Sequence, residues 1–157
     1  MTELLVCRED RSASRAGLEA LRRRPHVLIL DDHDASRSLC AAYCDLFDHT
    51  SETVGTRAEA MAALRRRRFD VVVMNVHMDG CGGLETLRAI RALPAPAGQA
   101  PVVGLTAVGR ADEAQRWLGA GLAAVVAKPV TAARLYAALG AANEAETDAA
   151  RSWAPAG

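Results

Sequence analysis

Four kinds of polar group that can do chemistry stand directly after short apolar runs of this sequence. They are the acids Asp31 and Asp32, the amide of Asn75, the hydroxyl of Thr106 and the amine of Lys128. Carboxylates are ligands that Mg²⁺ prefers, and a lysine forms charge-assisted hydrogen bonds to anions such as phosphate. Taken singly, each residue is better explained as a helix cap or a solvent-facing group. Brought together, they predict a site for a divalent cation and an anionic group.

Short apolar runs supply the strands that would bring these groups together. The runs are His26–Leu30, Val71–Met74, Val102–Leu105 and Leu122–Ala127, with Glu52–Val54 as a weaker fifth. Continuous apolar runs of this length are typical of strands that are covered on both faces, as in a parallel sheet.

Helical patterns fill the segments between the runs. Apolar residues recur at helix spacing after Asp34, which can cap a helix, and Thr56 to Glu59 has the sequence of a capping box. Three more helices are predicted over Gly83–Leu93, Ala111–Leu118 and Thr131–Leu139. Strands that alternate with helices imply right-handed crossovers and a doubly wound α/β sheet. In such sheets the functional crevice lies at the carboxyl ends of the strands.

The chain divides into three regions. Its 157 residues are enough for one domain with a full core and too few for two. Residues 1–24 form a polar, arginine-rich extension with a short helix predicted around Ser12–Arg23, and residues 25–141 form the patterned domain. Residues 142–157, rich in alanine and acids, are predicted to be a flexible tail.

Composition excludes several functions. The formal net charge is zero, which argues against general attraction to DNA or to an anionic membrane. No signal peptide and no apolar stretch of about 20 residues is present, so the protein is predicted to be cytoplasmic. The spacing of the four cysteines does not suit a zinc site: Cys7, Cys40, Cys44 and Cys81. Of these, Cys40 and Cys44 are predicted to be buried core residues.

The order of the motifs resembles one family. Four segments are similar to the receiver domain of bacterial response regulators, the CheY-like domain: Asp31-Asp32, Val73–Met78, Gly104–Ala107 and Ala127–Pro129. In that family the second of these segments contains the residue that accepts the phosphoryl group. The sequences of these segments most resemble the receiver domains of hybrid histidine kinases, and the resemblance covers residues 26 to 141. It implies a flavodoxin-like (βα)5 three-layer sandwich with a five-stranded parallel sheet in the order 2-1-3-4-5.

The resemblance also implies a role for each matching residue. Asp31 and Asp32 would hold Mg²⁺, with help from the main-chain carbonyl of His77. Thr106 would hydrogen-bond a phosphoryl oxygen, and Lys128 would contact the acceptor or its phosphate. Pro129 would shape the turn that follows, through a cis peptide bond. Mg²⁺ neutralises the charge that builds up during phosphoryl transfer.

The family pattern fails at the nucleophile. Asn75 stands at the phosphoacceptor position, and a neutral amide is a far poorer nucleophile than a carboxylate. One hypothesis is a pseudo-receiver that acts through protein contacts and binds Mg²⁺ weakly. It is favoured by further departures at Asp79, Gly82 and Val125. The alternative is an ordinary phospho-accepting receiver whose aspartate is replaced by asparagine in this sequence, which the retained acids and lysine favour.

A third hypothesis concerns four consecutive arginines. They end a predicted helix, where positive charge is favourable, and form a solvated face: Arg65, Arg66, Arg67 and Arg68. Arginine forks also match phosphates, so this run is a candidate site for an anionic ligand such as a cyclic dinucleotide.

The expected partners are proteins. The resemblance implies a histidine kinase or a histidine phosphotransfer domain, and a homodimer through the face of helix 4, strand 5 and helix 5. On that face Ala123, Val125 and Tyr136 are apolar, which favours a protein partner. Neither DNA nor membrane is expected as a partner, and the chain is not expected to be an enzyme.

Overall fold

A parallel sheet forms the centre of the molecule. The computed structural model describes residues 23–107 and 111–152, without the side chains of residue 81 and of residues 146–152. The predicted helix around 12–23 therefore lies almost entirely outside the described residues. The sheet has the order β2-β1-β3-β6-β7, with β1 His26–Leu30, β2 Thr50–Val54, β3 Val71–Asn75, β6 Val102–Thr106 and β7 Ala124–Ala127. Counted along the chain, this is the predicted order 2-1-3-4-5, and every pairing within the sheet is parallel.

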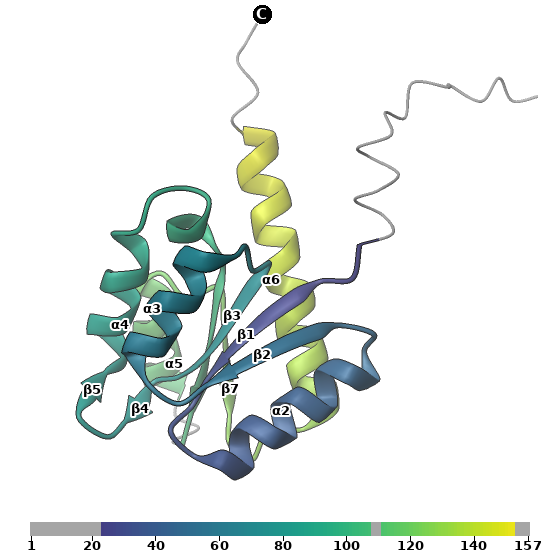
Figure 1. Cartoon of the computed structure of the whole chain (residues 1–157), viewed down its shortest axis with the longest axis vertical. Helices are drawn as coiled ribbons and strands as arrows, with labels where there is room; N and C mark the ends of the chain where they lie inside the picture. The colour runs from purple at the N-terminus through teal and green to yellow at the C-terminus, as the bar shows by residue number, and fades with distance from the viewer. Residues whose placement is uncertain (1–22, 108–110, 153–157) are drawn as a thin grey trace, which may run out of the picture.

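Helices cover both faces of the sheet, as the doubly wound prediction required (Figure 1). One face carries α2 (Asp34–Leu46) and α6 (Ala132–Ser152). The other carries α3 (Arg57–Arg66), α4 (Gly83–Arg91) and α5 (Ala111–Ala120), with a short 3-10 turn at Ala97–Gln99.

Strand alternation divides the interior into two cores. Val27 and Ile29 pack with α2 and α6, whereas Leu28 and Leu30 pack with α3 and α4. All four side chains are fully buried, because successive residues of a strand point to opposite faces. The apolar runs of the sequence are therefore explained by burial on both faces.

The predicted start of α2 was wrong by one residue, and that of α3 was confirmed. His33, in extended conformation, is the residue before α2, and Asp34 is the first helical residue, where its carboxylate pairs with Arg37. At α3 the Thr56 hydroxyl accepts from the Glu59 backbone N–H, at 3.2 Å, and the Glu59 carboxylate accepts from the Thr56 N–H. This is the reciprocal capping box that the sequence predicted.

The last helix is much longer than predicted. The sequence placed a helix over Thr131–Leu139 and a flexible tail from residue 142, whereas α6 runs to Ser152 and Ala142 is fully buried. Residues 140–152 are rich in alanine and glutamate, which are strong helix formers and extend a helix already anchored on the sheet. Beyond the sheet, α6 projects from the rest of the molecule (Figure 1).

A two-stranded hairpin follows β3 at the carboxyl edge of the sheet. It pairs β4 (His77–Met78) with β5 (Cys81–Gly82), and Gly80 between them has φ +69°. Glycine adopts that conformation at no steric cost, so this segment closes into a tight paired turn. In the described part of the chain, none of the helices is long and apolar enough to cross a membrane.

Candidate functional site

The polar residues that end four strands meet at one edge of the sheet, as predicted. Lys128, after β7, places its Nζ 3.2 Å from Asp31 Oδ2, and Asn75, at the end of β3, places its Nδ2 3.3 Å from Asp31 Oδ1. Asp31, Asn75 and Thr106 are buried, with exposed fractions of 0%, 3% and 2%. Polar groups are costly to bury, so this crevice is held together by the hydrogen bonds and the ion pair that its members form.

The side-chain amide of Asn75 is directed toward the two acids. Its nitrogen donates to Asp31 Oδ1 at 3.3 Å and to Asp32 Oδ1 at 3.2 Å. Its oxygen accepts from the backbone N–H of His77 at 3.2 Å. Because only the oxygen can accept from that N–H, the backbone of His77 fixes which end of the amide faces the carboxylates. The acid pair is thereby satisfied by a neutral donor.

Asp32 is held in its ionised form. Burial, the largest influence, raises the pKa of this carboxyl, but hydrogen bonds from the backbone N–H groups of Asp79 and of Asp32 itself lower it. His33 and the amide of Asn75 lower it further, and the resulting pKa lies below the ordinary value. The Asp79 N–H donates to Asp32 Oδ2 at 3.2 Å, so the hairpin contributes directly to the charge state of the crevice.

The acids can offer oxygen ligands to a metal ion. Ligand atoms of Asp31, Asp32 and His33 lie within 4.8 Å of one another, and the two carboxylates suit Mg²⁺. Sequence reasoning missed His33, whose only signal was its position next to the acids. The oxygen of Asn75 faces His77, so it adds no ligand, and Lys128 already contacts Asp31. The residues therefore fit a divalent cation through two carboxylates, in competition with groups already bound to them.

Thr106 and His77 lie on the α5 side of the crevice. His77 Nε2 is 3.3 Å from Thr106 Oγ1 and 2.9 Å from Glu113 Oε1. Sequence reasoning missed Glu113, because an acid in the first turn of a helix is commonplace. The peptide bond between Lys128 and Pro129 is cis, as the resemblance implied.

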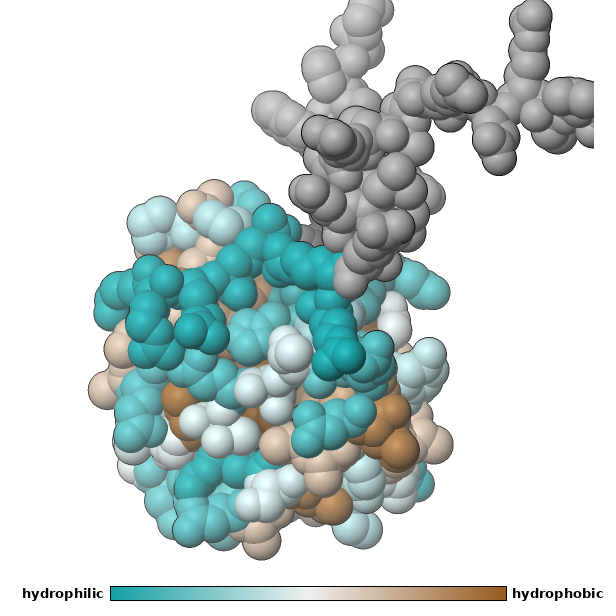
Figure 2. Space-filling model, turned by 45° about the vertical axis from the view of Figure 1, so that its right-hand side comes forward, coloured by the Kyte–Doolittle hydropathy of each residue, from teal (hydrophilic) through white to brown (hydrophobic). Residues whose placement is uncertain are grey.

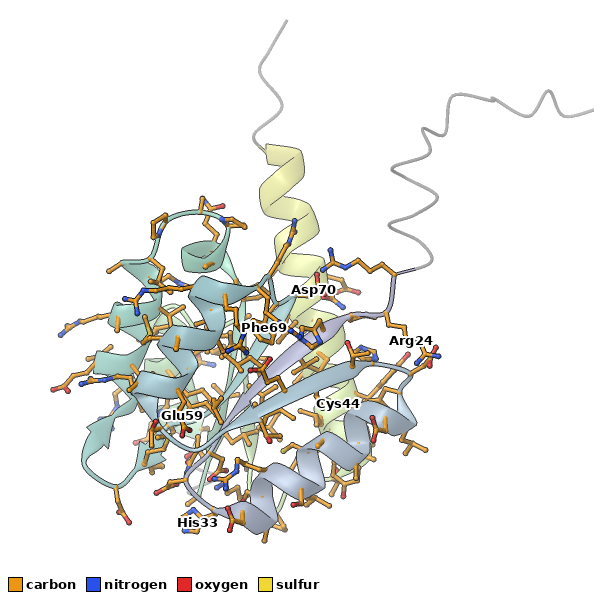
Figure 3. All side chains as sticks on the ribbon, in the orientation of Figure 1. Arg24, His33, Cys44, Glu59, Phe69 and Asp70 are labelled. Atoms are coloured by element: carbon orange, nitrogen blue, oxygen red, sulfur yellow. The ribbon has the colours of Figure 1, made fainter. Side chains whose placement is uncertain are left out.

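The arginine run lies away from this crevice. Arg66 and Arg67 pair with Glu52 of β2, at 2.5 and 3.8 Å. The end of α3 leads into the start of β3, so the run belongs to the amino edge of the sheet. Figure 3 shows the two edges: His33 lies at one, and Arg24 and Asp70 lie at the other. The sequence prediction of an anion site at Arg65–Arg68 is thus separate from the crevice, and an acid already neutralises part of the run.

A pocket of about 390 Å³, which the sequence did not predict, opens between α4 and α5. Its lining combines apolar and charged side chains: Leu84, Asp112, Glu113, Arg116, Trp117 and Ala120.

The prediction that Cys40 and Cys44 lie in the core is confirmed, since both are buried. Burial raises the pKa of the Cys40 thiol to about 11 and that of the Cys44 thiol to about 12.

This fold and crevice define a receiver domain of two-component signalling. The family model described as the response regulator receiver domain matches residues 27–140, and the chain belongs to that family. The sheet order, the two acids and the lysine at the carboxyl edge agree with that membership.

Hybrid sensor kinases contain similar segments. The chain is 32% identical over 105 residues to the sensor histidine kinase RcsC of Salmonella typhimurium, covering 67% of this chain and 11% of that protein. It is 31% identical over 114 residues to the sensory/regulatory protein RpfC of Xanthomonas campestris, covering 72% and 16%. The chain therefore spans only a small part of the length of these relatives.

Among solved structures, the chemotaxis response regulator CheY4 of Vibrio cholerae is similar, with a TM-score of 0.69 and 24% identity. The similarity covers 76% of this chain and 99% of that one. At this identity it shows the fold alone.

Proposed function

We propose that this chain is a pseudo-receiver, a signalling module that is not phosphorylated because Asn75 occupies the phosphoacceptor position. The observation that carries the proposal is the pair of hydrogen bonds from the Asn75 amide to Asp31 and Asp32. An amide neither attacks phosphorus effectively nor forms an acyl phosphate. Its N–H groups also donate hydrogen bonds to both acids, where a third carboxylate would instead need a cation beside it.

Mg²⁺ binding should be weak in this chain. Asp31 and Asp32 can bind it with the main-chain carbonyl of His77, but Asn75 contributes an N–H donor where an aspartate would contribute an anionic oxygen. Lys128 adds a positive charge 3.2 Å from Asp31 Oδ2. When bound, the ion would neutralise charge in the crevice. Thr106 and Lys128 would contact an anion in the crevice, and Pro129 would shape the turn after Lys128.

The chain is proposed to act on other proteins and not as an enzyme. Its similarity to segments of sensor histidine kinases supports a histidine kinase or a phosphotransfer domain as the partner. A second copy of the chain is a further candidate at the face of α5, β7 and α6, where Leu118 is 39% exposed. Tyr136, predicted to lie on that face, is 60% exposed but contacts Phe47 at the end of α2, with ring centroids 5.1 Å apart, so it lies on the α2 side of α6. On the surface shown in Figure 2, hydrophilic side chains predominate and hydrophobic ones form small separate spots.

Association through this face is testable. Sedimentation velocity should show concentration-dependent dimers that Leu118→Ser weakens at least about tenfold, because a large apolar contact is lost. Leu46→Ser is the matched control, since Leu46 is 72% exposed but lies on α2. Equal effects of the two variants would argue against a specific contact at α5, β7 and α6.

A second candidate function is an ordinary phospho-accepting receiver in which asparagine replaces the aspartate. It is favoured by the presence in the crevice of Asp31, Asp32, Thr106 and Lys128, which a site without phosphate chemistry does not need. On this alternative, restoring the carboxylate restores the reaction.

Intact mass after exposure to acetyl phosphate with Mg²⁺ tests both functions. The chain itself should gain no phosphoryl group, and a gain would overturn the pseudo-receiver proposal. If Asn75→Asp gains one, the crevice is competent and the second candidate is favoured; if it gains none, the pseudo-receiver is favoured. Asp79→Asn in the Asn75→Asp background is the matched control, because Asp79 is the nearby exposed acid of the hairpin.

A further inference from the structure

Three side chains, from β4, β6 and α5, converge on one carboxylate oxygen of α5 beside the crevice. Glu113 Oε1 lies 2.9 Å from His77 Nε2, 3.5 Å from Thr106 Oγ1 and 3.4 Å from Trp117 Nε1. The His77 and Trp117 rings are in edge-to-face contact, with their centroids 6.4 Å apart. We name Thr106, His77, Glu113 and Trp117 the latch.

Glu113 differs from the acid next to it. Asp112 also lies in the first turn of α5, but its side chain is 62% exposed and its carboxylate pairs with Arg116 of the same helix, at 3.6 Å. The Glu113 side chain is 21% exposed and reaches back to the end of β6 and to the hairpin. Helix-terminal electrostatics alone does not require these contacts.

The latch matters because α5 is weakly packed. All of α5 lies in the described part of the chain, and none of its residues is fully buried. Trp117 is the α5 side chain that packs, partly buried, against the core beneath α3 and α4. The contacts of Glu113 with Thr106 of β6 and His77 of β4 therefore add to the packing of Trp117 in joining α5 to the rest of the domain.

The Thr106 hydroxyl has a single hydrogen to donate. When it donates to Glu113, it cannot donate to an anion in the crevice at the same time. We propose that the Glu113 carboxylate holds the Thr106 hydroxyl when no anion is bound in the crevice. An anion that accepts from Thr106 and the hydrogen bond from Thr106 to Glu113 then exclude each other, so that binding of the anion releases the first turn of α5. This proposal does not depend on whether Asn75 blocks phosphorylation.

The latch also connects the crevice to the pocket between α4 and α5. Glu113 and Trp117 line that pocket as well as forming the latch. Release of Glu113 from Thr106 and His77 would change the shape of the pocket and the position of Trp117. The state of the crevice can thereby be transmitted to the surface of α5.

Removal of Glu113 tests the latch. In a Trp153→Phe background, which leaves Trp117 as the sole tryptophan, Glu113→Ala should speed amide exchange across Ala111–Ala120 about tenfold. Collisional quenching of Trp117 fluorescence should rise in parallel. Asp112→Ala is the matched control, since it removes a neighbouring acid from the same turn and should change both signals less than about twofold. Equal changes in the two variants would overturn the proposal.

A double-mutant cycle separates the latch from a general loosening of the helix. Thr106→Val keeps the shape of the side chain and removes its hydroxyl. If Thr106 and Glu113 act together, Glu113→Ala should speed exchange several-fold less in the Thr106→Val background than in the parent. Additive effects would overturn the coupling. Circular dichroism and cooperative unfolding of each variant establish that it is folded, so that loss of exchange protection refers to α5.

Discussion

Charged side chains at the two edges of the central sheet differ in how far they are exposed to water. At the carboxyl edge Asp31 is fully buried, and its lysine partner is 23% exposed. At the amino edge the Arg23–Asp70 pair has exposed fractions of 51% and 21%, and the Arg24–Asp48 pair 64% and 76%. Both edges are rich in charge, but of these pairs only the one at the carboxyl edge has a fully buried carboxylate, that of Asp31.

This difference helps to distinguish charged residues that belong to a solvated surface from charged residues that belong to a functional site. Exposed ion pairs contribute little to stability and cost little to form. Burial of a carboxylate has a desolvation cost that its ion pair and hydrogen bonds must offset. Hydrophobic residues of similar size would often stabilise the fold as well. Residues kept at such a cost at the carboxyl ends of parallel strands indicate function, whereas the pairs at the amino edge indicate a solvated surface.

The largest effect is expected from Lys128→Met. The substitution leaves the buried carboxylate of Asp31 without its cation, and the free energy of unfolding should fall by about 2 kcal/mol, discounted because the amine is partly exposed. Denaturant unfolding measures the loss. A change below about 0.5 kcal/mol would contradict the contrast between the two edges.

The next effect is expected from Asn75→Asp. It replaces the donor between Asp31 and Asp32 with a third negative charge, and should lower the free energy of unfolding by about 1–3 kcal/mol without divalent cations. Millimolar Mg²⁺ should restore the loss by binding the folded state. Titration calorimetry should show Mg²⁺ binding at least about tenfold tighter than in the parent. Equal affinity would contradict the weak-metal interpretation of Asn75.

At the amino edge Arg23→Gln should cost less than about 1 kcal/mol in the free energy of unfolding, because the ion pair with Asp70 is screened by solvent. The same denaturant measurement serves, with Lys128→Met as the comparison. A loss as large as that of Lys128→Met would mean that the amino edge is as tightly organised as the crevice.

The smallest effect concerns pH. Burial chiefly, with Arg67 second, lowers the pKa of His26, and His26 Nε2 is buried with no hydrogen-bond partner among the described residues. The folded state then binds fewer protons than the unfolded state, so the stabilisation is present above the unfolded pKa of about 6.5 and is lost as the pH falls through the folded pKa. The expected loss is below about 1 kcal/mol after solvent screening.

Unfolding free energies measured between pH 8 and pH 5 test this, with His26→Gln as the control that removes only this histidine from the titration. An identical pH dependence in the two proteins would assign the slope to other groups.

Much of the fold was predictable because its signals are local. The apolar runs located all five strands of the sheet to within one or two residues, and the capping box of Thr56 located the start of α3. The long α6 was missed because its second half projects beyond the sheet and shows no apolar periodicity, although its residues favour helix. The hairpin after β3 was missed because two-residue strands leave no pattern.

The site was predictable to a similar degree. Asp31, Asp32, Asn75, Thr106 and Lys128 were found from their positions after strands, and their convergence follows from parallel topology. His33, Glu113 and the pocket between α4 and α5 were not, since a histidine beside acids and an acid early in a helix occur widely on protein surfaces.

The sequence by itself determined which strands form, which residues end them, and that an amide stands where the resemblance requires a carboxylate. These features depend on residue type and on periods of a few residues, which a single chain displays directly. The tertiary structure alone decided that the Asn75 nitrogen faces both acids and that Glu113 reaches Thr106. Each contact joins residues from separate elements, and its geometry exists only after the elements have packed.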